Sequence, residues 1–224
     1  MRPALLVWAL AVFVLVVLAG APAAFWSRWI PWPEGWAPQA VSGTLWRGQA
    51  ERLGVLAPLR WRVRLADGPA LEVSAGALQR DWQAVVRGWP WAWQATLEDG
   101  GPGPASDELV RLEGAWQGRV LVRGQGRRCV AAEGGLHAPR LVLIAPWGMP
   151  LGRGDLELDC TGSPRLNARL ERAGHHRFAL TALPDARRSD LAGSVEPGSE
   201  LAALLRQFGL IDAGQQRFET SMSW

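Results

Sequence analysis

The feature that most constrains the fold is an alternation of apolar and polar side chains that recurs along the chain. In residues 59–65, Leu59, Trp61, Val63 and Leu65 alternate with three arginines. A period of two residues predicts a strand with one face on a core and the other in solvent. Related patterns occur at residues 91–97, 156–160, 166–170, 176–180 and 218–224. The body of the chain is therefore expected to be rich in strands.

Glycine-rich turn signals separate these strands, at Asp67-Gly68, Asp99-Gly100-Gly101, Gly124-Gln125-Gly126, Gly134-Gly135 and Gly162-Ser163-Pro164. The stretch 99–106, rich in glycine and proline, is interpreted as a long loop. Spacings of about 8 to 15 residues leave no room for helical crossovers between parallel strands, so the sheet is predicted to be antiparallel. Only residues 199–208 have leucines at helical spacing, with Ser199 as the N-cap and Gly209 as the stop signal.

The expected fold class is an all-β body with one short helix near the C-terminus. The strands would form an antiparallel meander, arranged as a twisted sheet, a half-barrel or a sandwich. A sheet with one apolar face has to cover that face by closing, by folding over or by curling into a trough. The sequence does not decide between these three arrangements. The favoured interpretation is that the aromatic residues fill the core of the domain itself.

The N-terminal segment carries no charged side chain from residue 3 to residue 27. As a helix, residues 4–21 would extend about 27 Å, close to the hydrocarbon thickness of a bilayer. Trp26, Trp29, Trp32 and Trp36 follow, and indole rings favour the membrane interface. We therefore expect a short cytoplasmic tail (1–3), a single transmembrane anchor (4–26), a Trp/Pro-rich spacer (27–39) and a periplasmic β-rich domain (40–224). The alternative is a signal peptide cleaved at Ala21-Pro22-Ala23.

The chain has two cysteines, Cys129 and Cys160, which is the even number expected for one disulfide in an exported body. A metal site is the weaker interpretation, because neither cysteine belongs to a CxxC pair. His137, His175 and His176 also lack ligand spacing relative to the cysteines. We predict a structural disulfide and no metal site.

Composition and motifs argue against two classes of function. The 24 basic residues are all arginine and stand against 21 acidic residues, and they are spread along the chain, whereas nucleic-acid binders usually cluster them. No nucleophile elbow, phosphate loop or dinucleotide fingerprint occurs. Glu157 and Asp159 are two residues apart on one strand and are interpreted as a solvated face. We therefore expect no catalytic residue, no cofactor and no small-molecule substrate.

One short string, residues 41–50 (VSGTLWRGQA), carries a resemblance to a family. From the residues alone, Gly43 and Gly48 bracket a strand-favouring Thr-Leu-Trp segment, which suggests a stabilising first strand. The string also resembles the type II secretion system protein N family, with matching positions at Ser42, Gly43, Thr44, Leu45, Trp46, Gly48 and Ala50. The order of anchor, Pro/Trp spacer, motif and β-rich body is similar as well, as is the leucine-rich helix before a last strand.

This resemblance implies a non-enzymatic accessory component of the apparatus that exports folded proteins across the outer membrane. Such a protein is single-pass in the inner membrane, and its partners are the other platform proteins of the secretion system and the outer-membrane secretin. The family supplies no catalytic residue. A more distant resemblance is to AsmA-like envelope proteins, which are usually much longer and carry a similar string. That alternative implies a protein that shields or transfers lipid in the periplasm along an open apolar groove.

Overall fold

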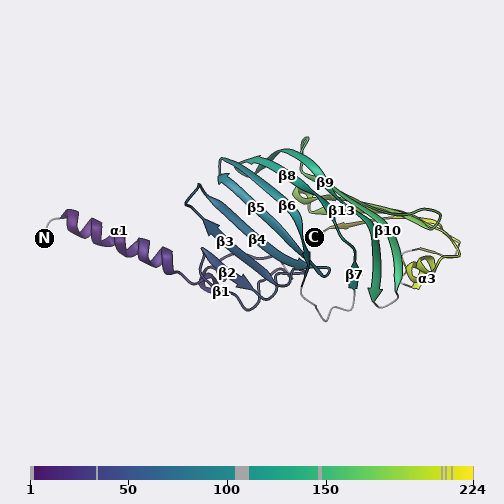
Figure 1. Ribbon diagram of the computed structural model, residues 1–224, viewed down its shortest axis with the longest axis horizontal. Coiled ribbons are helices and arrows are strands. Elements are labelled where there is room, and N and C mark those ends of the chain that lie inside the picture. Colours follow the sequence, from purple (N-terminus) through teal and green to yellow (C-terminus); the bar gives the residue numbers. More distant parts are fainter. Residues whose placement is uncertain are drawn as a thin grey trace.

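The computed structural model describes residues 3–33, 35–103, 111–145, 148–207, 209, 211–212 and 214–223. It consists of one large curved sheet with a helix projecting from one end (Figure 1). Neighbouring strands pair antiparallel throughout the described sheet, and their order follows the chain except that β7 lies beside β9. The predicted all-β antiparallel meander is therefore confirmed.

The sheet runs from β1 to β14 without a described pairing between these two end strands. Its strands are β1 (Ser42–Gly43), β2 (Arg47–Ala50), β3 (Leu59–Arg64), β4 (Ala70–Ala77), β5 (Arg80–Trp89), β6 (Ala92–Pro102), β7 (Arg111–Glu113), β8 (Gln117–Gln125), β9 (Arg128–Ala145), β10 (Met149–Asp159), β11 (Arg165–Arg172), β12 (His176–Leu183), β13 (Arg188–Val195) and β14 (Arg217–Ser223). A one-turn 3₁₀ helix, Pro184–Ala186, joins β12 to β13. The six segments with the alternating pattern coincide with these strands, except that Leu65, Trp91 and Cys160 lie one residue outside β3, β6 and β10. Trp224, the end of the last segment, lies outside the described residues.

Strand register sorts the side chains onto two faces, as the alternation predicts. One row of paired positions joins Trp61, Val73, Ala84, Leu97 and Val120. On the second half of the sheet a similar row joins Leu136, Leu156, Ala168, Leu180 and Leu191. We call the face that carries these rows the inner face and the opposite one the outer face.

The sheet curls around its inner face. The evidence is Trp116, which precedes β8: its ring lies 5.9 Å from the ring of Trp82 on β5. The same indole lies close to Gly154 on β10, where a Cβ atom would come within 3.2 Å of it. One side chain thus reaches the inner faces of strands on either side of β8 and β9, which requires a bent sheet.

Glycines allow large rings to lie flat on the inner face. Gly48 is the register partner of Trp61, and Gly124 is the partner of Trp93. A Cβ atom at either glycine would lie within 2.4 Å of the partner's indole ring. Since the missing Cβ leaves room for the ring, each tryptophan covers the neighbouring strand rather than pointing across the trough.

Two predicted turns are wrong, because strands continue through them. Gly134-Gly135 lies inside β9, where Gly134 has a φ of +81° and a Cβ atom there would meet the carbonyl oxygen of Arg119. Asp99-Gly100-Gly101 belongs to β6, which runs to Pro102; residues 104–106 of the expected loop lie outside the described residues. In both places glycine permits a bend or a close approach within a strand and does not end it.

The N-terminal helix ends before the expected anchor (4–26) does. Helix α1 is Pro3–Gly20, and a separate five-residue helix, α2 (Ala23–Ser27), follows Pro22. A proline lacks the backbone N–H that a continuing helix needs, which explains the break before residue 23. Along the described part of the chain, no helix combines the length and apolar character required to cross a membrane. Met1 and Arg2 of the expected cytoplasmic tail lie outside the described residues.

The predicted C-terminal helix is present as α3 (Glu200–Gln207). The Ser199 side-chain oxygen accepts a hydrogen bond from the backbone N–H of Ala202 at 3.2 Å, which is the predicted N-cap. Phe208 lies outside the described residues, and Gly209 adopts a φ of +69°. Leu201 and Leu205 turn toward the inner face, where α3 packs beside Phe178 and Phe218. The helix therefore covers part of the second half of the trough.

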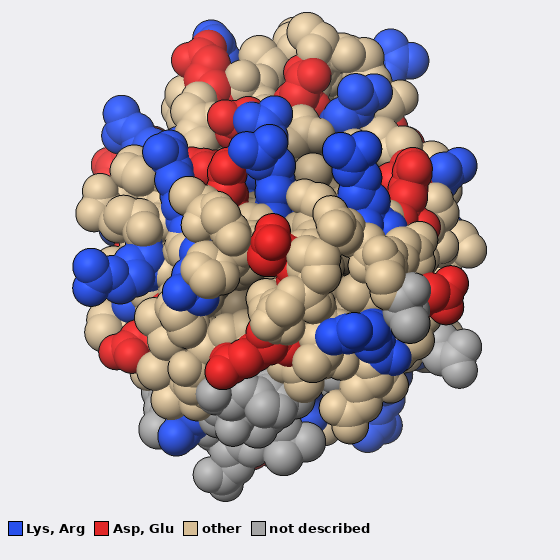
Figure 2. Space-filling model, turned by 90° about the vertical axis from the view of Figure 1, so that its right-hand side faces the viewer, with Lys and Arg blue, Asp and Glu red and all other residues tan. Residues whose placement is uncertain are grey.

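The outer face carries charged side chains of both signs. Described ion pairs join neighbouring positions, such as Arg123 with Glu133, Arg177 with Glu171 and Arg188 with Asp190. On the side of the molecule shown in Figure 2, basic and acidic residues lie next to one another over most of the surface. This distribution agrees with the interspersed arginines of the sequence.

Candidate functional site: the inner face of the sheet

The inner face is apolar, but the chain does not fill it. Most of its apolar side chains are half-buried, including Trp61, Val73 and Leu180. Among the described residues, the largest side chain that is fully buried is Leu136. A domain that used this face as an ordinary core would bury such side chains completely. The structure therefore leaves an apolar surface available along the trough.

Part of this surface forms a cavity of about 410 Å³ beside α3. Its lining is almost wholly apolar, with Ala168, Leu180 and Leu191 from the sheet and Leu201 and Leu205 from the helix. Cavities of about 300–1,000 Å³ are typical of sites for small ligands. The cavity can hold an apolar group by exclusion of water, because its walls offer few polar partners.

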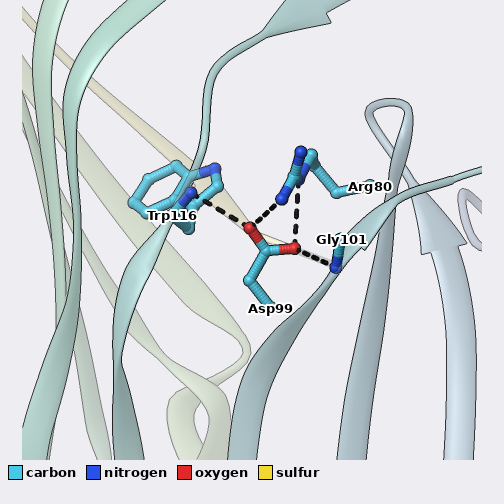
Figure 3. A network of polar contacts seen from close by, with 4 residues as sticks. All are labelled: Arg80, Asp99, Gly101 and Trp116. Atoms are coloured by element: carbon cyan, nitrogen blue, oxygen red, sulfur yellow. Dashed lines mark hydrogen bonds and ion pairs between the residues drawn. The ribbon is translucent and has the colours of Figure 1, made fainter.

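A buried ion pair fixes the point where Trp116 enters the trough (Figure 3). Asp99 accepts hydrogen bonds from Arg80 Nε at 3.0 Å and from the backbone N–H groups of Gly101 and Trp116 at 2.9 and 3.0 Å. Arg80 Nη2 also contacts the second carboxylate oxygen. Burial raises the pKa of Asp99, but these hydrogen bonds outweigh it and hold the pKa below its ordinary value. The ionised carboxylate thus positions Trp116.

The family-like motif forms the first edge of the sheet. Ser42 and Gly43 form β1, and Gly48 and Ala50 lie in β2, with a tight turn at Thr44, Leu45 and Trp46 between them. The indole N–H of Trp61 donates to the backbone oxygens of Thr44 and Leu45, at 3.2 Å in each case. The Trp46 backbone oxygen accepts a hydrogen bond from the N–H of Val63 at 2.7 Å. The motif therefore fastens the edge hairpin to β3.

We expect Gly48→Ala to destabilise the body by about 1–3 kcal/mol, because overpacking forces neighbouring groups to move. The added Cβ would lie 2.3 Å from the Trp61 ring and 2.7 Å from the Ser42 backbone oxygen. The measurement is the free energy of unfolding in urea. Gly198→Ala is the matched control, since a Cβ there meets nothing within 4 Å. Equal stability of the two variants would contradict the role assigned to Gly48.

The four tryptophans of the predicted interfacial collar are not gathered into one cluster by the described contacts. Trp29 is exposed, and Trp32 donates from its indole to the Ser27 backbone oxygen at 2.8 Å. Trp36 lies on Gly54 of the β-rich body. Trp26 packs edge-on against Phe25, and its indole N–H is buried without a described partner. The collar remains a prediction, with Trp29 as its most exposed member.

Cys129 and Cys160 are joined in a disulfide with a Cα–Cα distance of 5.6 Å, as predicted. Cys129 is near the start of β9, and Cys160 directly follows β10. The ladder between these two strands ends at the pair Leu136–Leu156. Beyond that pair the strands have no described pairing with each other, so the disulfide holds them together where hydrogen bonds no longer do.

His176 is buried at the start of β12, and its Nε2 lies 2.9 Å from the Leu151 backbone oxygen. Its ring is stacked on Phe178, 5.2 Å between centroids. Desolvation by burial lowers the pKa of His176 from its ordinary value near 6.5. The neutral ring therefore donates its Nε2 proton to the carbonyl.

We expect part of the stability to be lost as the pH falls below about 6.5, where the unfolded histidine takes up a proton that folded His176 resists. Stability from this group is fully present above that pH. His176→Gln removes the titration, so its free energy of unfolding should fall less between pH 7.5 and pH 5. His137→Gln, at an exposed histidine on β9, is the control and should behave like the wild type. An identical pH dependence in all three proteins would contradict the assignment.

The carboxylates singled out from the sequence do not form a site. Asp159 accepts hydrogen bonds from the Thr161 backbone N–H at 2.8 Å and from its hydroxyl, and these lower the pKa of Asp159. Glu157 lies on the exposed outer face of the same strand, β10. Within the described chain, no cluster of histidine, cysteine and carboxylate side chains is arranged to hold a metal ion. Comparisons with protein families, curated proteins and solved structures found no match.

Proposed function

We propose that this chain is a non-enzymatic accessory component of a type II secretion system. Its N-terminal segment anchors it in the inner membrane, and its β-rich body lies in the periplasm and takes part in protein export across the outer membrane. The resemblance of residues 42–50 supports this proposal, because the matching positions form a defined hairpin at the edge of the sheet. A disulfide between Cys129 and Cys160 fits an oxidising compartment.

The observation that carries a binding role is the unfilled apolar inner face. An exposed apolar surface bounded by polar residues is typical of an interaction site. For a secretion component, the expected occupants are apolar segments of the other platform proteins or of the secretin. The edge strand β14 (Arg217–Ser223) offers a second means of docking, since another chain can add a strand to it.

The test is secretion by a strain that lacks the gene. We expect type II exoproteins to accumulate in the periplasm and the wild-type gene to restore export. Leu180→Glu, which places a charge in the apolar cavity, should fail to restore export while the protein still accumulates. The outer-face variant Glu133→Gln should restore it. Normal export in the deletion strain would overturn the secretion role.

A second candidate function is shielding or transfer of lipid, as in AsmA-like envelope proteins. The cavity of about 410 Å³ beside α3 favours it, because an acyl chain matches the almost wholly apolar lining. Native mass spectrometry of the full chain, purified in detergent, measures the bound mass. A stoichiometric phospholipid that disappears in Leu180→Glu favours this function, whereas a protein without lipid argues against it.

A further inference from the structure

We infer that one end of the sheet is a membrane-contacting surface that binds anionic phospholipid headgroups. It is formed by three hairpins, residues 64–69, 87–93 and 123–128, which we call the tryptophan rim. This surface is separate from the N-terminal tryptophans and from the family-like motif. The inference requires only that the body faces a bilayer, so it does not depend on a role in secretion.

The three hairpins form one connected surface. The backbone N–H of Gly88 donates to the Pro69 oxygen at 3.0 Å, and the N–H of Gly126 donates to the Pro90 oxygen at 2.9 Å. The Trp93 indole also donates to the Gly126 oxygen at 2.9 Å. Because these bonds join each hairpin to the next, the rim is built as a unit from segments up to about sixty residues apart in sequence.

Large apolar side chains project from this rim. Trp89 is 54% exposed, Trp91 is 67% exposed and Leu65 is 59% exposed. The two indole rings are stacked, with centroids 5.2 Å apart and planes inclined by 2°. Burying both tryptophans and the leucine in water-free surroundings would be favourable, and indole rings in particular favour the headgroup region of a bilayer.

The charge on the rim matches an anionic surface. Its hairpins carry five arginines and a single acidic residue, Asp67. Arg87, Arg127 and Arg128 are exposed and have no described ion pair, while Arg64 and Arg123 each pair with a glutamate on the outer face. On the side of the molecule shown in Figure 2, by contrast, acidic residues interrupt the arginines throughout. Arginines beside exposed aromatic rings are the combination expected of a lipid-surface site.

Two further observations point to lipid. A cavity of about 660 Å³ opens at the rim, lined by apolar residues including Val86 and Trp93, with Arg127 also among the lining residues. An amphiphile with an anionic head and an acyl tail fits that arrangement. In Figure 1, the arrowheads of β3, β5 and β8, which mark the rim, point toward the side from which α1 projects. The apolar helix and the rim can therefore meet the same membrane.

Hydrogen exchange of the full chain in nanodiscs tests the inference. We expect slower amide exchange in the 87–93 segment with discs containing phosphatidylglycerol than with phosphatidylcholine alone. The hairpin at residues 77–80 is the internal control, because it lies at the opposite end of β4 and β5 and also exposes a large residue, Leu78. Its exchange should not change with lipid composition.

Two kinds of variant sharpen the test. Trp89→Ser with Trp91→Ser should abolish the protection of the rim, and Arg87→Gln or Arg127→Gln should weaken it about five-fold for each arginine removed. Neither change touches a buried contact, so thermal unfolding should match the wild type. Equal exchange of the rim in both types of disc, or equal protection of the 77–80 hairpin, would overturn the inference.

Discussion

Replacement of both cysteines by alanine is expected to lower the free energy of unfolding by about 3.5 kcal/mol. The disulfide closes a loop with a sequence separation of 31 residues, and the chain-entropy model gives this magnitude for loops of that length. Single domains are usually stable by only about 5–15 kcal/mol, so the loss would be a large part of the total. Urea unfolding under oxidising conditions measures it.

The position of the bond explains why the effect should also be local. Cys129 and Cys160 flank the region where β9 and β10 have no described pairing beyond Leu136 and Leu156. Reduction of the wild-type protein should reproduce the double variant, which serves as the control. A change below about 0.5 kcal/mol, typical of surface substitutions, or two alkylatable thiols in the unreduced, unfolded protein would contradict the assignment.

The second large effect is expected at Asp99. Asp99→Asn should cost about 3 kcal/mol, because it leaves the Arg80 guanidinium without its counter-charge in a mostly buried position. The Asp99 side chain is 3% exposed and that of Arg80 is 16% exposed. The free energy of unfolding at neutral pH measures the loss. Trp116 should also become more mobile, since its backbone N–H donates to the same carboxylate.

The matched control is an exposed ion pair of the same kind. In the Arg123–Glu133 pair both side chains are more than half exposed, so Glu133→Gln should change stability by less than about 1 kcal/mol. The lowered pKa of Asp99 adds a pH signature: its stabilising contribution is present above the ordinary carboxyl pKa and is lost as the pH falls through the lower, folded value. Equal effects of the two variants would contradict the buried network.

The sequence predicted those parts of the fold that depend on local pattern. The alternation in residues 59–65 places Trp61 on the inner face and Arg60 on the outer face, as the register with β4 requires. The helical spacing after Ser199 is likewise sufficient for α3, including its N-cap. Each of these features depends on residues that are close in sequence: about one helical turn apart in a helix, or two residues apart in a strand. The periodicity of apolar residues in a sequence reports these short-range relations.

The same signals failed where glycine serves a long-range contact. The glycine pair at Gly134 predicts a turn, but Gly134 lies within a strand where only a glycine avoids the Arg119 carbonyl oxygen on β8. Gly48 and Gly124 accept tryptophan rings from adjacent strands, a use that appears only once register is known. In a single sequence, a glycine that forms a turn cannot be distinguished from one that bends a strand or leaves room for an aromatic ring.

An open trough is one of the alternatives that the sequence leaves, but the tryptophan rim is not predicted at all, for a similar reason. The aromatic residues are expected to fill the core of the domain, because the sequence shows how many apolar residues there are. It does not show how far apart a curved sheet places them. The rim needed the positions of all strands: in an antiparallel meander, every second turn lies at the same end of the sheet. Turns near residues 67, 90 and 126 obey that rule, so a complete strand assignment would have brought Trp89 and Arg127 together.

The most direct test of an open inner face measures whether this face binds an apolar ligand. An open inner face predicts saturable, enhanced fluorescence of 1-N-phenylnaphthylamine with the folded full chain in detergent below its micellar concentration. Ala168→Trp, which fills the cavity beside α3, should weaken this binding, while the outer-face variant Glu133→Gln should retain it. Absence of saturable binding to the wild-type protein, or unchanged binding in Ala168→Trp, would contradict an open apolar inner face.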